Sequence, residues 1–195
     1  MVWGGVRMRG LDELTAGLAG YGVPVLVSGL EPHVPPDASS FLVDLARSSD
    51  PRIRVATIAL WLARPDLAGA VPPAIRLLER LEPAAVARLR WSYQAAVFLQ
   101  RRWLYMIELY TARKTSRLLP DLFGGAMQLP SPEDMDGQAG LLALAEMERG
   151  SDPAAPYAVL ATYESAVELL RAMWLGRRAP DAGPREQAET LDPVR

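Results

Sequence analysis

A stretch of about 35 residues without glycine or internal proline constrains this chain more than any other feature. It runs from residue 84 to residue 118 and reads AAVARLRWSYQAAVFLQRRWLYMIELYTARKTSRL. Glycine and proline are the residues that interrupt helices, so the stretch predicts one uninterrupted helix. At about 1.5 Å per residue this helix would be roughly 50 Å long. We expect it to be the central packing element of a single all-α domain.

One side of this predicted helix is apolar. Successive residues on a helix turn by about 100°, and the residues that then fall within roughly 100° of one another form a core face. This core face consists of Val86, Leu89, Tyr93, Ala96, Val97, Leu104 and Ile107. A continuous apolar stripe of this kind is typical of a helix packed against a hydrophobic core.

The other side of the same helix combines arginine with aromatic and apolar side chains. The arginines opposite the core face are Arg88, Arg102, Arg113 and Arg117, and an aromatic seam beside them consists of Trp91, Phe98, Tyr105 and Leu109. We take these eight residues as the candidate partner-binding set. Arginine beside aromatic side chains is typical of protein-binding hot spots and of surfaces that bind single-stranded nucleic acid. A central helix whose arginine stems lie over apolar surface gives the same pattern, so the pattern leaves all three interpretations open.

The net charge of −2 conceals a gradient along the chain. Residues 86–117 hold seven basic side chains and one acidic side chain, whereas residues 118–195 hold six basic and thirteen acidic ones. Two interpretations follow. Either the two segments neutralise each other within one fold, or the long helix offers a basic surface to an acidic partner.

The N-terminal half predicts short helices separated by proline. We expect helices at residues 11–19, 38–47 and 51–64, and a further helix that begins at Val71-Pro72-Pro73. Asp50-Pro51 is typical of a helix start, with aspartate at the N-cap and proline at the first helical position.

The run SSDPRIRVATIALWLARPDLAGAVPPAIRLLERL resembles a HEAT-type helical repeat. The resemblance covers residues 38–82 and is carried by Asp50-Pro51, Arg54 and Val71-Pro72, with the long helix standing where the next second helix would be. It implies HEAT-like helical hairpins packed on the long helix, a link between neighbouring repeats through the Asp and the Arg, and binding surfaces formed by stacked helices.

The C-terminal part predicts a loop, two helices and a tail. Ser131-Pro132 is typical of a helix start, and a short helix is expected at residues 141–147. Asp152-Pro153 predicts the start of the last helix, which should end at Leu175-Gly176. Residues 1–176 would then form the domain, and residues 177–195, which lack apolar periodicity, would be a disordered tail.

Residue types exclude several kinds of chemistry. The chain has no cysteine, which removes disulfides, thiolate metal sites and a cysteine nucleophile. Its one histidine, His33, lies in a proline-rich loop. The sequence contains no P-loop, no dinucleotide fingerprint, no GxSxG and no HExxH. We therefore expect no catalytic residues, no cofactor and no metal.

These observations favour a non-enzymatic helical module that binds another protein or a second copy of itself, as the accessory component of a two-component bacterial system. The alternative is a nucleic-acid-associated protein that uses the basic aromatic side of helix 84–118. The longest apolar run, residues 55–63, is far shorter than the roughly 18 residues of a membrane span. The N-terminus lacks the apolar core of a signal peptide, so we expect a soluble cytoplasmic protein, with Met8 as an alternative start.

Overall fold

The computed structural model describes residues 8–25, 31–112, 118–151 and 158–178. In chain order its elements are α1 (Leu11–Gly20), α2 (Ala38–Arg47), α3 (Pro51–Ala63), the 3₁₀ turn η1 (Pro65–Ala70), α4 (Val71–Leu81), α5 (Pro83–Thr111), the 3₁₀ turn η2 (Asp134–Gly137), α6 (Gln138–Ser151) and α7 (Val159–Arg178). This part of the chain is helical and contains no strand, which confirms the predicted all-α class. None of its helices combines the length and apolarity that crossing a bilayer requires.

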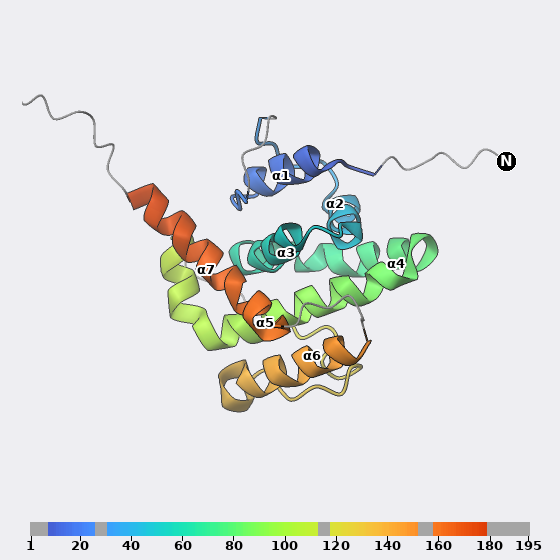
Figure 1. Cartoon of the computed structure of the whole chain (residues 1–195), viewed down its shortest axis with the longest axis vertical. Coiled ribbons are helices and arrows are strands. Elements are labelled where there is room, and N and C mark those ends of the chain that lie inside the picture. Colours follow the sequence, from blue (N-terminus) through green and yellow to red (C-terminus); the bar gives the residue numbers. More distant parts are fainter. Residues whose placement is uncertain (1–7, 26–30, 113–117, 152–157, 179–195) are drawn as a thin grey trace, which may run out of the picture.

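Helix α5 occupies the middle of the fold. Figure 1 shows it crossing the molecule, with α3 and α4 on one side and α6 on the other. Helices α2, α3, α4, α6 and α7 all pack against it. The glycine-free stretch therefore forms the central element, as its sequence predicts.

The predicted helix 84–118 is too long. Helix α5 bends at Trp103, whose φ of −120° and ψ of 25° are not helical, and it ends at Thr111. Ala112 then adopts a left-handed conformation with a φ of 53°. Beyond the bend the helix packs against α7, where the Tyr110 and Trp174 rings lie 5.7 Å apart. Packing against α7 thus accompanies a bend that no glycine or proline marks in the sequence.

The middle of α5 is covered on every side. All ten residues from Trp91 to Gln100 are buried, whereas a helix with a single core face would leave some of them exposed. Helix α6 and η2 cover one side, and the chain following residue 117 returns along the same helix. Here the Leu119 backbone N–H donates to Gln100 Oε1 over 2.6 Å, and the Tyr93 hydroxyl donates to the Pro120 carbonyl over 2.9 Å.

Most of the predicted helix boundaries hold. Helices α2, α3 and α4 begin at the predicted residues, and the Asp50 carboxylate accepts the Arg52 backbone N–H at the start of α3. The predicted helix start at Ser131-Pro132 is wrong, because α6 begins only at Gln138. Met135 and Asp136 have positive φ angles of 49° and 51°, which interrupt a helix before it forms.

Three predictions concern residues at the edge of the described ranges. Helix α7 continues to Arg178, two residues past its predicted end, so residues 177 and 178 are helical. The rest of the predicted tail, residues 179–195, lies outside the described residues, and so do residues 1–7 and the predicted helix start at Asp152-Pro153.

Helix α6 approaches α5 closely through glycine. A Cβ atom added at Gly140 would lie 2.1 Å from Cε1 of the Phe98 ring, and one added at Gly137 would lie 2.4 Å from the Phe98 carbonyl oxygen. Real Cβ atoms do not approach other atoms this closely, so α5 is in contact with η2 at Gly137 and with α6 at Gly140.

We expect Gly140→Ala to lower the free energy of unfolding by about 1–3 kcal/mol, because the new methyl group overpacks the contact with Phe98. Gly150→Ala is the matched control on the same helix, since no atom lies within 4 Å of its Cβ position. This control should raise the free energy of unfolding by roughly 0.5–1 kcal/mol through helix propensity. Urea denaturation followed by circular dichroism checks both variants. Equal stability of the two would contradict the close contact.

Candidate functional site

The structure divides the eight candidate partner-binding residues. Trp91 and Phe98 are buried, and the Phe98 side chain packs beneath α6. Tyr105 is 86% exposed and Leu109 is 45% exposed. Arg113 and Arg117 lie outside the described residues. The aromatic seam predicted from the sequence is therefore not one surface, since only its second half reaches solvent.

The two described arginines of the set are both bound to neighbouring groups. Arg88 donates from Nε to the Ala46 carbonyl over 2.9 Å and from Nη2 to Glu82 over 2.8 Å. Arg102 donates to Gln138 Oε1 over 2.9 Å and lies 4.0 Å from the Glu164 carboxylate. These contacts hold the two guanidinium groups at different places on the fold, one against α2 and the other against α6 and α7.

The C-terminal part of α5 instead exposes four large apolar side chains. We call them the α5 apolar face: Trp103, Tyr105, Met106 and Leu109. Two of these, Trp103 and Met106, were not among the predicted site residues. Both lie at or beyond the bend, where α5 leaves the covered centre of the fold. The prediction assumed a straight helix, and the angular position of a residue on a straight helix does not show that α5 bends and becomes exposed at Trp103.

A guanidinium group lies at each end of the α5 apolar face, and the Glu164 carboxylate lies 4.0 Å from one of them. Arg102 precedes it, with its guanidinium carbon 5.3 Å from the centre of the Trp103 ring. Arg177 of α7 lies at its other end, where Nη2 donates to the Tyr110 carbonyl over 2.8 Å. From Trp103 to Thr111, Glu108 is the single charged residue. An apolar surface between two guanidinium groups suits a partner whose apolar side is flanked by carboxylates.

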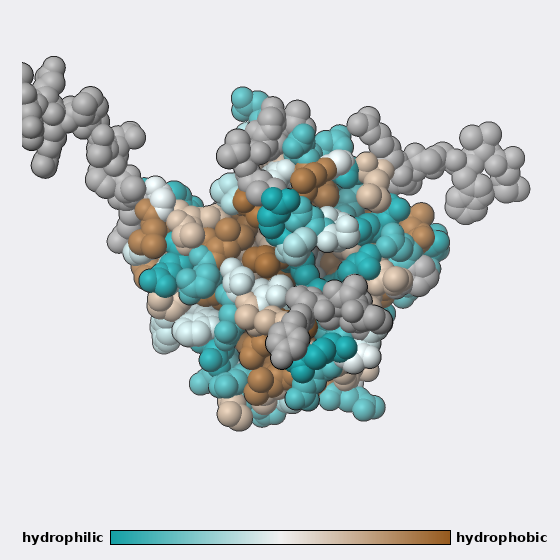
Figure 2. All heavy atoms as spheres, in the orientation of Figure 1, coloured by the Kyte–Doolittle hydropathy of each residue, from teal (hydrophilic) through white to brown (hydrophobic). Residues whose placement is uncertain are grey.

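A pocket of about 860 Å³ lies elsewhere on the molecule. Its lining comes from the end of α2, the loop from α2 to α3, the first turns of α3, the N-terminal half of α5 and one side of α7. Figure 2 shows apolar residues on the same side of the molecule, along α7 and between α7 and α3. The charged residues of its lining are Arg47, Asp50, Arg52, Arg54, Glu82 and Arg88. Sequence reasoning missed this site, because Arg88 alone of these six belongs to the predicted set.

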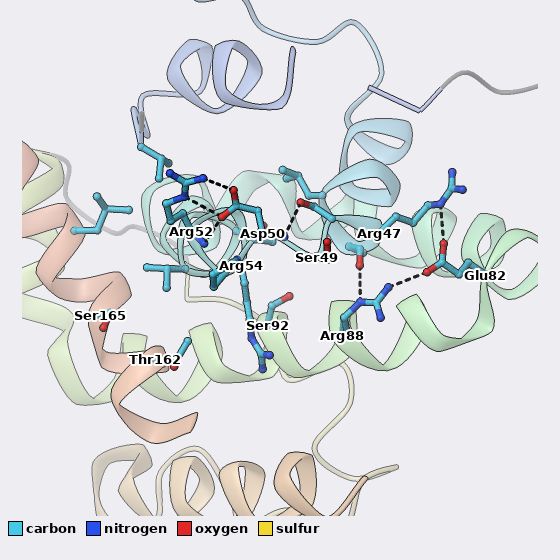
Figure 3. Close-up of a pocket in the computed structure, with 18 residues that line it drawn as sticks. Arg47, Ser49, Asp50, Arg52, Arg54, Glu82, Arg88, Ser92, Thr162 and Ser165 are labelled. Carbon is cyan, nitrogen blue, oxygen red and sulfur yellow. Dashed lines mark hydrogen bonds and ion pairs between the residues drawn. The ribbon is translucent and has the colours of Figure 1, made fainter. Parts of the chain in front are cut away.

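One end of the pocket is organised by Glu82, which lies between two arginines (Figure 3). Arg47 Nε donates to one of its carboxylate oxygens over 2.9 Å, and Arg88 Nη2 donates to the other over 2.8 Å. Burial opposes ionisation of Glu82, but the two guanidinium groups outweigh it and lower the pKa of this carboxyl. Glu82 is therefore an anion at neutral pH that holds Arg47 and Arg88 side by side.

The other charged pairs at the pocket involve α3. Arg52 forms a forked pair with Asp50, over 3.0 and 2.7 Å, and these hydrogen bonds lower the pKa of Asp50. Arg54 passes between α3 and α5 and pairs with Glu148 of α6. The Tyr163 hydroxyl of α7 also donates to Glu148, whose side chain is fully buried. Burial raises the pKa of Tyr163, so its hydroxyl stays protonated and remains a donor.

Among the described residues, no three His, Asp or Glu side chains are placed to hold a metal ion. Four hydroxyl groups of the pocket donate to carbonyls of their own helices: those of Thr57, Ser92, Thr162 and Ser165. Comparison of the chain with protein-family models, with curated proteins and with solved structures finds no match.

Proposed function

We propose that this protein is a non-enzymatic helical module that binds another protein through the α5 apolar face. The observation that carries the proposal is the exposure of Tyr105 and Leu109, one turn apart on a helix whose preceding ten-residue segment is completely buried. Large apolar side chains gathered on one exposed surface are typical of protein interfaces. The partner we propose presents an apolar ridge flanked by carboxylates, which would face Arg102 and Arg177.

We propose that this partner is the other component of a two-component bacterial system. A module without catalytic groups of its own would act through the protein that it binds. A partner protein is also better supported than nucleic acid, because Arg88 and Arg102 lie against different helices and do not form one basic strip. Nucleic-acid binding requires basic side chains that follow a phosphate backbone together.

We also propose that residues 38–82, with the start of α5, pack in the manner of HEAT hairpins. Helix α2 packs mainly against α4, and α3 packs strongly against α5, so equivalent helices of two successive hairpins lie side by side. The N-terminal half of α5 then takes the place of the second helix of the second hairpin. Asp50 and Arg54, which the HEAT resemblance assigns to a link between neighbouring repeats, have different partners here. Asp50 pairs with Arg52, and Arg54 pairs with Glu148 of α6.

The double variant Tyr105→Asp, Leu109→Asp should lose the partner. Two carboxylates would place unpaired charge in the centre of an apolar contact, and we expect recovery of the partner to fall at least about tenfold. The measurement is affinity capture from a lysate of the native host, with quantitative mass spectrometry. The matched control is Leu77→Asp, Leu81→Asp on α4, whose leucines are also exposed.

The proposal requires a protein that the wild type and the α4 control capture and that the α5 variant does not. Capture that is unchanged in the α5 variant would contradict it. Sedimentation tests self-association separately. A concentration-dependent dimer that the α5 variant abolishes would show that the face binds a second copy instead of another protein.

A further inference from the structure

We propose that the pocket between α2, α3, α5 and α7 binds a small phosphorylated molecule that carries hydroxyl groups. Its volume of about 860 Å³ lies within the range of roughly 300–1,000 Å³ typical of small-molecule sites. The α5 residues that line it, Arg88 and Ser92, precede the α5 apolar face by more than ten residues. The pocket lining therefore shares no residue with the α5 apolar face.

Positive charge converges on the pocket from three helices. Arg47 ends α2, Arg52 and Arg54 lie in the first turns of α3, and Arg88 lies on α5. The carboxylates that pair with these four groups are Asp50, Glu82 and Glu148. Four guanidinium groups against three carboxylates leave an excess of one positive charge. The pocket is thus better suited to an anion than to a neutral ligand.

Arg47 and Arg88, at the Glu82 end of the pocket, have N–H donors that their contacts within the protein do not use. Each guanidinium has five N–H donors. Hydrogen bonds to Glu82 and to the Ala46 carbonyl engage Nε of Arg47 and both Nε and Nη2 of Arg88. Among the described residues, the two terminal nitrogens of Arg47 and Nη1 of Arg88 have no hydrogen-bond acceptor. Forked N–H donors held side by side match the oxygens of a phosphate group.

The pocket also offers hydroxyl oxygens. Thr57 of α3 and Thr162 and Ser165 of α7 donate their protons to carbonyls of their own helices, over 2.7, 3.2 and 2.7 Å. Figure 3 shows Thr162 and Ser165 on the α7 side of the pocket, away from Glu82 and Arg88. Once its proton is used in this way, a hydroxyl group faces a ligand as an acceptor. Such acceptors match the hydroxyl groups of a sugar or polyol.

The lining also argues against a nucleobase as the main ligand. Its described residues include no aromatic side chain, so the pocket has no platform on which a base would stack. The apolar part consists of small aliphatic side chains such as Val55 and Leu169. We therefore assign the ligand as the phosphate ester of a sugar or polyol.

Isothermal titration calorimetry with ribose 5-phosphate, ribose, inorganic phosphate and adenine tests this proposal on the full chain at 0.15 M salt. We expect ribose 5-phosphate to bind at least about tenfold more tightly than ribose or inorganic phosphate, because it engages both sides of the pocket. Adenine should not bind. Equal binding of ribose 5-phosphate and inorganic phosphate would overturn the sugar assignment, and equal binding of ribose would overturn the phosphate assignment.

Two variants locate the binding. Arg52→Gln removes one guanidinium that is 56% exposed and whose ion pair is with a neighbour in sequence, so the fold should be preserved. Arg47→Gln removes another from the Glu82 end. Arg47→Gln should weaken ribose 5-phosphate binding by about tenfold, the usual loss for one charge-assisted contact. Arg52→Gln should weaken it by a smaller factor, because the Arg52 guanidinium is held by Asp50 and its loss only lowers the positive charge of the pocket. Arg76→Gln, on the exposed side of α4, is the control and should bind like the wild type.

Circular dichroism establishes whether each variant is folded, and Arg88→Gln, at the same end of the pocket, decides the question if Arg47→Gln does not fold. Wild-type affinity for ribose 5-phosphate in a folded Arg47→Gln or Arg88→Gln protein would overturn the assignment to this pocket. A failure of all four probes to bind the wild type would overturn the proposal entirely.

Discussion

Replacing Arg54 with methionine should lower the free energy of unfolding by about 3–5 kcal/mol, the usual loss when one partner of a buried ion pair is removed. Glu148, with which Arg54 pairs, has a fully buried side chain on α6. The Tyr163 hydroxyl supplies one hydrogen bond to the same carboxylate. Without Arg54, Glu148 would be left as a buried charge with one neutral donor. Urea denaturation at pH 7, followed by circular dichroism, gives the measurement.

Two further variants separate the buried charge from the loss of arginine packing. Arg52→Met, two residues earlier on α3, breaks an exposed pair and should change the free energy of unfolding by about 1 kcal/mol or less. Arg54→Met, Glu148→Leu removes both charges and should be more stable than Arg54→Met alone, because the uncompensated carboxylate is gone. If the double variant is the less stable of the two, the ion pair is not the source of the effect.

The sequence contains most of the information for the boundaries of the N-terminal helices. Asp50-Pro51 specifies a helix start through the Asp50 side-chain hydrogen bond and the backbone preference of proline, and Val71-Pro72 does so through proline alone. Both effects operate within a few residues. The start of α5 is likewise predicted to within one residue, after Pro83. These features are local, so a single sequence is enough to find them.

Contacts between distant parts of the chain account for what the sequence did not predict. The ion pair between Arg54 and Glu148 joins α3 to α6, and no sequence pattern around either residue predicts that the two side chains meet. The pocket likewise depends on α2, α3, α5 and α7 meeting at one place. The spacing of residues on one helix does not show which other helices pack against it. The bend at Trp103 also changes the direction of α5, and no glycine or proline in the sequence predicts it.

Phe98 and Tyr105 lie seven residues apart on α5, and an ideal straight helix would place them on nearly the same side. The fold separates them. Phe98 lies before the bend and packs against Gly140 of α6, whereas Tyr105 lies after it and is 86% exposed. Phe98→Ala should therefore lower the free energy of unfolding by about 3–5 kcal/mol, through a cavity between α5 and α6. Tyr105→Ala should change it by roughly 0.5 kcal/mol or less.

Partner capture should fall more in Tyr105→Ala than in Phe98→Ala, the reverse of their order of effect on stability. Tyr105→Ala removes a side chain from the proposed interface, whereas Phe98→Ala leaves the exposed side chains in place in the molecules that remain folded. Denaturation of both variants, with capture measured at a temperature where both are folded, gives the comparison. Similar losses of stability in the two variants would contradict the separation, because they would mean that both side chains are packed to the same extent in the folded protein.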